Sequence, residues 1–203
     1  MSKFKSAPLY QLLGVIAVIL LATLFGPEEK SLGANVRIVY LHGAWVLAAE
    51  VAFIAAGLAG LIGLLTRREA FHDWSAALGR TGTVFWITYL PLSLLAMQTN
   101  WNGLFLSEPR FRLALTFAIV GALMQTGLWL VNHKVLTSIA NLAYIIALRI
   151  IFSMAANVMH PPPSPIFNSG LWDVIIFFVL LNLLAWLAAY FLTRWFLTLQ
   201  KSA

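Results

Sequence analysis

The sequence predicts an all-α integral membrane protein, a bundle of about six transmembrane helices with both termini in the cytoplasm. Of its 203 residues, 61% are hydrophobic and only 10% are charged, and the mean hydropathy is +0.87. An ordinary soluble domain is about half apolar and about a quarter charged. Several apolar runs reach the roughly 20 residues that cross about 30 Å of hydrocarbon, and none alternates as a membrane β-strand does.

The first apolar run, Pro8 to Phe25, follows Lys3 and Lys5, as the apolar part of a signal peptide would. It is long, however, and it ends in FGPEEK rather than in a small-residue cleavage site. We therefore predict that it forms the first transmembrane helix. The second run, Val39 to Leu65, forms the second helix, and its GLAGLIG segment permits close approach of a neighbouring helix.

Four further runs complete the predicted bundle and leave no room for a soluble domain within residues 1–203. The fifth run is predicted to end just after His160, because the prolines of HPPPSPIF lack the N–H groups that a helix needs. The four runs are Leu78 to Met97, Phe111 to Val131, Val135 to Val158 and Leu171 to Leu197.

Lysine and arginine set the predicted orientation, because they concentrate in the cytoplasmic loops of membrane proteins. The net charge of +6 is then explained by attraction to the membrane surface, and no nucleic-acid partner is needed. We predict a multi-pass protein of a bacterial inner (plasma) membrane or of an organellar equivalent. With the N-terminus inside, the cytoplasmic set is Lys3, Lys5, Arg67, Arg68, Arg80, Lys134, Arg194 and Lys201, and the outer set is Lys30, Arg37, Arg110 and Arg112.

The absence of cysteine excludes disulfides, thiolate metal sites, iron–sulfur clusters and the covalent attachment of a c-type haem. The sequence also contains no phosphate-binding glycine loop, no H-E-x-x-H motif and no nucleophile–base–acid set. Covalent catalysis is therefore not implied. Any metal or haem has to be held by histidine or by weaker ligands.

Topology separates the four histidines. His72 and His133 fall in the predicted cytoplasmic loops, where we expect solvated side chains. His42 begins the second helix and His160 ends the fifth, so both lie at the outer face. Two neutral imidazoles at one depth suit the two sides of a haem as axial ligands, although each also fits a plain position among lipid headgroups.

The outer segment TNWNGLFLSEPRFRLAL supplies further candidate haem contacts. Trp101 and Phe105 share a face if this segment is helical, and they form an aromatic shelf if it is a loop. Arg110 and Arg112 follow, and a guanidinium pairs well with a carboxylate such as a haem propionate. The alternative is an ordinary interfacial aromatic belt with arginines that extend to the headgroups.

Two charged residues fall well away from the ends of predicted spans, where a charge costs at least about 2.5 to 3.5 kcal/mol. Glu50 lies about two turns inward from His42, and Arg149 lies in the fifth span. We expect them to pair as a clasp if the second and fifth helices are neighbours; a proton or ion path is the alternative. Asn141 and Asn157 are candidates for further interhelical hydrogen bonds.

Together these features resemble the haem-handling membrane proteins of cytochrome c maturation, the CcmC/CcsA-type family, over nearly the whole chain. Family members share the six-span plan and carry an outer loop of the form W-G-x-x-W-x-W-D-x-R, flanked by two histidines. YLHGAW is similar to the family pattern Y-x-H-x-x-x-W around the leading histidine, with its tryptophan one residue early at Trp45. ANVMHPPPSPIF puts His160 at the position of the trailing histidine.

WNGLFLSEPR aligns with the family loop without a gap. Trp101 and Arg110 match it, and Glu108 stands for the aspartate. In the family this loop is thought to hold haem against a haem chaperone or an acceptor cytochrome, and the loss of two indoles here removes much flat contact area. The positions that differ are Phe105 and Ser107, in place of the second and third tryptophans, and Asn102, in place of the glycine.

The resemblance implies a protein that binds haem b at the outer membrane face, with His42 and His160 as axial ligands, and holds it for transfer. The implied partner is an outer-face haem chaperone or another subunit of a membrane complex. One alternative is a haem-bearing membrane subunit of a respiratory electron-transfer complex, and another is a haem-free scaffold or small transporter. The other predicted cofactor contacts are Trp101, Phe105, Arg110, Arg37, Arg112 and Trp45.

Overall fold

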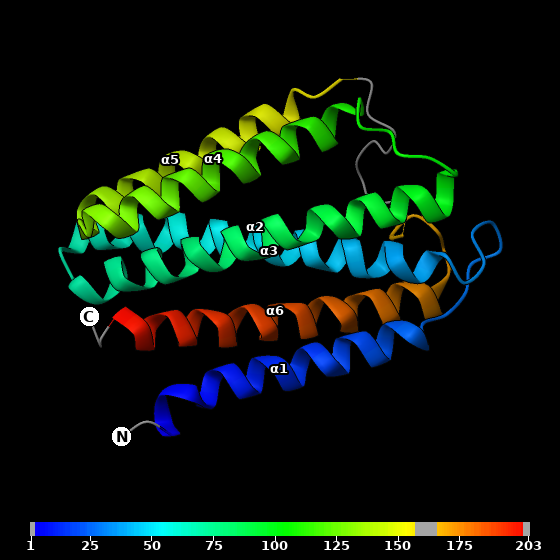
Figure 1. The fold of residues 1–203 in the computed structure, drawn as a ribbon, viewed down its shortest axis with the longest axis horizontal. Helices are drawn as coiled ribbons and strands as arrows, with labels where there is room; N and C mark the ends of the chain where they lie inside the picture. The colour runs from blue at the N-terminus through cyan, green and yellow to red at the C-terminus, as the bar shows by residue number, and fades with distance from the viewer. Residues whose placement is uncertain (1–2, 157–165, 201–203) are drawn as a thin grey trace.

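The computed structural model describes residues 3–156 and 166–200, with side chains from residue 7 onward. Every regular element in these ranges is a helix, so the all-α part of the predicted fold class is confirmed for the part of the chain that is described. The helices are α1 (Lys3–Leu24), α2 (Val36–Thr66), α3 (Glu69–Trp101), α4 (Pro109–Val131), α5 (Lys134–Ser153) and α6 (Trp172–Gln200) (Figure 1).

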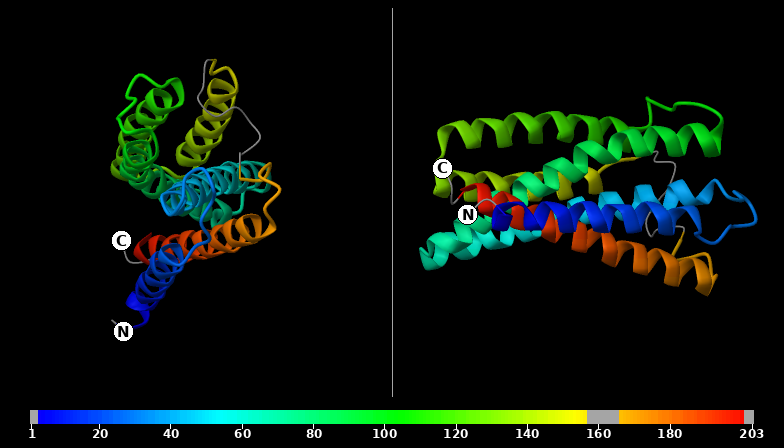
Figure 2. Two further views of the ribbon diagram at one scale, coloured as in Figure 1. Left: turned by 90° about the vertical axis from the view of Figure 1, so that its right-hand side faces the viewer. Right: turned by 60° about the horizontal axis from the view of Figure 1, so that its bottom comes forward.

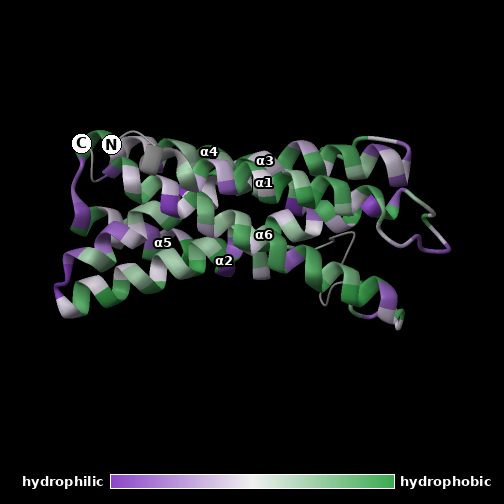
Figure 3. Cartoon of the chain, turned by 90° about the horizontal axis from the view of Figure 1, so that it is seen from below, coloured by the Kyte–Doolittle hydropathy of each residue, from purple (hydrophilic) through white to green (hydrophobic). Residues whose placement is uncertain are grey.

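Five of these described helices, all except α3, are long and apolar enough to cross a membrane. The exception has 33 residues, but charged and hydroxyl side chains interrupt its first half. Figure 3 shows apolar residues along most of the helical surface and hydrophilic residues gathered at the connections between helices. This distribution is that of a membrane-embedded bundle, because a bilayer core solvates apolar side chains and excludes charged ones.

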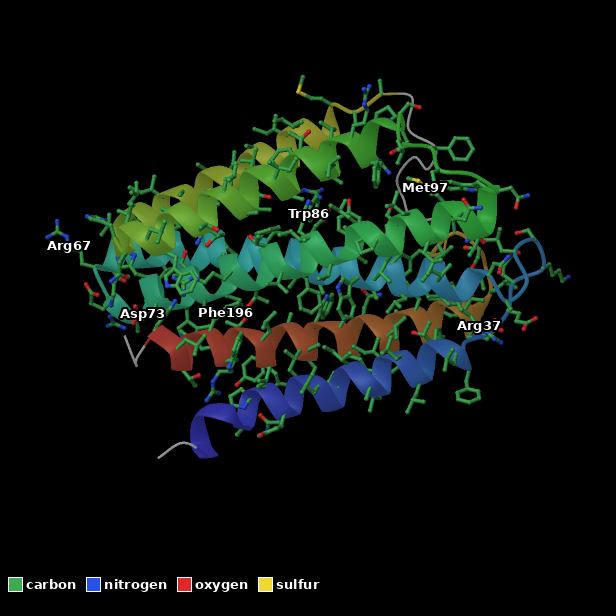
Figure 4. All side chains as sticks on the ribbon, viewed as in Figure 1. Arg37, Arg67, Asp73, Trp86, Met97 and Phe196 are labelled. Atoms are coloured by element: carbon green, nitrogen blue, oxygen red, sulfur yellow. The ribbon has the colours of Figure 1, made fainter. Side chains whose placement is uncertain are left out.

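The helices form three layers, with α2 and α3 in the middle, α4 and α5 on one side, and α1 and α6 on the other (Figures 1 and 2). The beginning of α1 and the end of α6 lie at the same end of the bundle, as do Arg67 and Asp73, while Arg37 lies at the opposite end (Figures 1 and 4). We call these the inner end and the outer end, after the predicted orientation.

Glycines on α2 let α3 and α5 approach it closely, as the sequence predicts. A Cβ atom at Gly57 would lie 2.8 Å from a side-chain carbon of Ile145 in α5. A Cβ atom at Gly60 would lie 2.9 Å from the carbonyl oxygen of Ser138 in α5 and 3.0 Å from the hydroxyl of Ser75 in α3. The backbone of α2 therefore packs directly against two neighbours.

The fifth helix ends at Ser153, earlier than the predicted Val158. The Met154 amide is shared between its i−4 and i−3 carbonyls, both at 3.2 Å, and the Ser153 hydroxyl donates to the Ile150 carbonyl at 2.7 Å. Bonding to the i−3 carbonyl tightens the last turn and competes with continuation of the helix. The prediction that the proline run ends this helix is wrong, because the helix stops before the run begins.

The third helix begins at Glu69, nine residues earlier than predicted, so His72 lies in its first turn. The prediction of a solvated loop position for His72 is therefore wrong. Its side chain is 4% exposed, and Nδ1 lies 2.7 Å from the Ser138 hydroxyl. Gly63 makes room for this ring, since a Cβ atom there would lie 2.9 Å from Nδ1. His133, in contrast, is exposed in the α4–α5 connection as predicted.

We predict that Gly60→Ala lowers the stability of the bundle by about 1–3 kcal/mol, because the added methyl group overpacks the contact between α2 and α5. Thermal unfolding in detergent measures this. Gly14→Ala is the matched control, since a Cβ atom there meets nothing within 4 Å. Equal melting temperatures for the two variants would contradict the packing described here.

Candidate functional site

His42 lies in the outer part of α2, at the edge of an aromatic cluster. Its half-buried ring is 5.4 Å from the ring of Tyr89 in α3, at an interplanar angle of 44°. Tyr89 is buried and lies 5.2 Å from Trp86 in an edge contact. The Trp86 indole N–H in turn donates to the Ala114 carbonyl of α4 at 2.9 Å. These fixed rings restrict how the imidazole is oriented.

The packing of α2 against α5 fixes the level of His42. Glu50 pairs with Arg149, and the two helices run antiparallel. His42 lies eight residues outward from Glu50 along α2. On α5 the same level would be reached eight residues after Arg149, but α5 ends after only four, at Ser153. Thus α5 stops below the level of His42. The connection from α5 to α6 carries His160, which lies outside the described residues.

Trp101 and Phe105 make the aromatic pair that the sequence predicts. Trp101 is the last residue of α3, and Asn102 ends the helix in a left-handed conformation (φ 52°). The chain then turns so that the ring of Phe105 meets that of Trp101 edge to face, with centroids 5.9 Å apart. Phe105 is 40% exposed, so the pair forms a partly open apolar surface at the outer end.

The two predicted arginines lie at the start of α4, a few residues after the Trp101–Phe105 pair in the sequence. Glu108 caps the helix, because its carboxylate accepts a hydrogen bond from the Phe111 amide at 2.6 Å, and Pro109 occupies the first turn. Arg110 is half-buried, whereas Arg112 is exposed and lines an apolar groove between α3 and α4. The acidic residue of the loop therefore acts locally as a helix cap.

Arg37 and Trp45, also predicted as cofactor contacts, each have a hydrogen-bond partner in the structure. Arg37 donates to the Gly26 carbonyl at 2.9 Å and pairs with Glu28 at 3.1 Å, which fixes the connection from α1 to α2. The Trp45 indole N–H donates to the Thr88 hydroxyl of α3 at 2.9 Å. Both side chains thus have local structural partners.

Glu50 and Arg149 form the predicted ion pair, with Arg149 Nη1 at 3.0 Å from Glu50 Oε2. The condition for this pairing is met, since α2 and α5 are neighbours. The exposed fraction of the side chain is 22% for Glu50 and 57% for Arg149. Arg110 also acts electrostatically on the Glu50 carboxylate. The ion-pair partner of Glu50 in α2 therefore comes from α5.

A buried polar network towards the inner end was only partly predictable. The Gln125 amide donates to the Asn141 side chain at 2.7 Å, and Asn141 donates to the Ser75 hydroxyl at 3.1 Å. Ser75 donates in turn to the Ala56 carbonyl at 2.8 Å, so four helices are joined. His72 and Ser75, three residues apart, share one face of α3, and this spacing is the sequence signal for the network.

The candidate residues fit a haem better than a metal ion held by protein ligands alone. Within the described ranges, no group of three or more His, Cys, Asp or Glu residues could hold a metal ion. A haem needs fewer protein ligands, because the porphyrin nitrogens occupy four coordination positions of the iron and the protein supplies only the axial ligands. His42 offers one such ligand, and Trp101, Phe105 and Arg110 offer apolar and cationic contacts at the same end.

Comparison with protein families, curated proteins and solved structures finds no match for this chain. The resemblance of its sequence to the cytochrome c maturation proteins stays a prediction.

We predict that Glu50→Gln or Arg149→Gln alone lowers stability by about 1–3 kcal/mol, because each leaves a charge without its partner. The double variant should lose less than the two single losses combined. Unfolding in detergent measures all three, with Arg194→Gln as a control for loss of an exposed arginine at the inner end. Strictly additive losses would be inconsistent with a direct pair.

Proposed function

We propose that this protein binds haem b at the outer membrane face, between His42 and His160, and holds it for transfer to a partner in cytochrome c assembly. The observation that carries the proposal is the level of His42, which lies beyond the end of α5 and beside the aromatic cluster of Tyr89 and Trp86. The resemblance of YLHGAW and of the WNGLFLSEPR loop to the haem-handling family supplies the expected ligand.

The connectivity supports His160 as the second ligand. Both α5 and α6 pack against α2, the helix that carries His42. The connection that joins them leaves α5 at Ser153, below the level of His42, and enters α6 at Trp172. On this proposal, His160, which lies outside the described residues, meets the haem from this connection.

The other proposed haem contacts are of two kinds, aromatic rings for the porphyrin and guanidinium groups for the propionates. Trp101 and Phe105 provide apolar rings against which a porphyrin packs. Arg110, with Arg37 or Arg112, provides guanidinium groups for the propionates. Bound haem would supply an iron that accepts two imidazole nitrogens and is able to cycle between ferrous and ferric states. The chain's own work is to bind, orient and present that group.

The charge distribution supports a cytoplasmic inner end. Arg67 and Arg68 lie in one of its connections, Lys134 begins α5 next to the other, and α1 begins and α6 ends there. On this proposal the membrane is a bacterial inner membrane or its organellar equivalent, and the haem partner, a haem chaperone or another membrane subunit, approaches from the opposite face.

We predict that purified protein incubated with haem shows a six-coordinate b-type absorption spectrum, oxidised and reduced, which His42→Ala and His160→Ala each abolish or alter. His133→Ala is the control, because its exposed ring caps α5 at the inner end, where Nδ1 accepts from the Leu136 amide. A wild-type protein without a Soret band after added haem would refute the proposal. Haem retained alongside co-purified redox subunits would favour the electron-transfer alternative.

We also predict that Trp101→Ala weakens haem binding about tenfold, the loss expected from removing a large stacked ring. Titration followed at the Soret band measures the affinity. Trp172→Ala is the matched control, since this tryptophan also lies at the outer end but is 74% exposed. If the two variants bind haem equally well, the Trp101–Phe105 pair does not contact the haem.

A further inference from the structure

The Glu50–Arg149 pair is placed unusually for a simple clasp between helices. Arg149 lies four residues before the end of α5, and its side chain is 57% exposed. It is flanked by exposed apolar residues, including Ile146 at 50% and Ile150 at 54%, which mark a surface in contact with hydrocarbon. A guanidinium at such a position is costly unless its donors are satisfied.

The ion pair uses only part of the guanidinium. Arginine carries five N–H donors, and the described hydrogen bond to Glu50 employs Nη1. The pair is not the sole contact between α2 and α5, because Gly57 and Gly60 let the two helices approach closely further along the same seam. The pair thus leaves a cationic group, fixed in direction by Glu50, with capacity for a second anionic partner.

We propose that Arg149, positioned by Glu50, binds a propionate carboxylate of the haem from the membrane side of the site. This inference rests on the proposed function, and it adds a residue that neither the aromatic loop nor the histidines indicate. The ligand it selects is an amphipathic tetrapyrrole with free carboxylates on one edge.

The geometry permits this contact. Eight residues of α2 separate Glu50 from His42, a rise of about 12 Å at 1.5 Å per residue. Arg149 would hold a carboxylate of a haem bound at His42, on the inner side of that residue, where its guanidinium already meets Glu50.

Electrostatics favour an anion at this place. Arg149 contacts the Glu50 carboxylate directly and pairs with it through one of its nitrogens. The guanidinium donors that this bond leaves unused attract a carboxylate, and the surrounding apolar helices strengthen that attraction relative to water. The hydrogen bond to Glu50 fixes the Arg149 guanidinium against α2.

The test compares haem with its dimethyl ester, which has the same ring and iron but no free carboxylates. Soret titrations give the affinity ratio of the two ligands for the wild type, for Arg149→Gln and for the charge-neutral double variant Glu50→Gln with Arg149→Gln. The double variant guards against a single variant that does not fold. Arg194→Gln is the control, because its guanidinium contacts Tyr190 of its own helix at the inner end.

We expect the wild type and Arg194→Gln to prefer haem over the ester, and both Arg149 variants to lose about 10-fold to 100-fold of that preference, the effect of one charge-assisted contact. Ester binding should stay unchanged. An unchanged preference in the Arg149 variants, or equal weakening of both ligands, would overturn the assignment and leave the pair as a structural clasp. Absence of binding by the wild type would instead refute the proposed function, and this assignment with it.

Discussion

The close approach of α3 and α5 to the glycine face of α2 is the constraint on which the rest of the structure depends. A Cβ atom at Gly57 or Gly60 would lie within 3 Å of an atom of α5, so these positions let the two helices pack closely in the observed register. That register pairs Glu50 with Arg149 and leaves His42 beyond the end of α5. The proposed ligand position is therefore a consequence of helix packing at the opposite half of α2.

Polar side chains inside the bundle occur in two groups with different characters. Towards the inner end, Gln125, Asn141 and Ser75 satisfy one another across the helices and are buried, as a structural lock in a medium without water requires. Towards the outer end, the pair of Glu50 with Arg149 is partly exposed and retains donor capacity. On our proposal, this contrast separates a group that holds helices together from a group that binds a ligand.

The sequence predicts the fold well because apolar run length alone marks a membrane helix, and the Glu50–Arg149 pair follows from the cost of burying charge. Prediction from the sequence fails where local hydrogen bonds set the end of a helix, or where a neighbouring helix determines whether a side chain is buried. The end of α5 is set by carbonyl sharing around Ser153, for which no helix-breaking residue gives a signal. Likewise His72 is buried only because Gly63 of another helix leaves space for its ring. The contacts of Arg37 and Trp45 equally depend on neighbours that composition does not reveal.

The central claim is that one iron joins two imidazoles at the outer end. Pulsed electron paramagnetic resonance of the ferric, haem-loaded protein, produced with ¹⁵N-labelled histidine, tests this most directly, because hyperfine coupling counts the histidine nitrogens bound to iron. The account predicts coupling to two histidines in the wild type and to one at most after His42→Ala. Coupling to no histidine, or coupling that His42→Ala leaves unchanged, would contradict it.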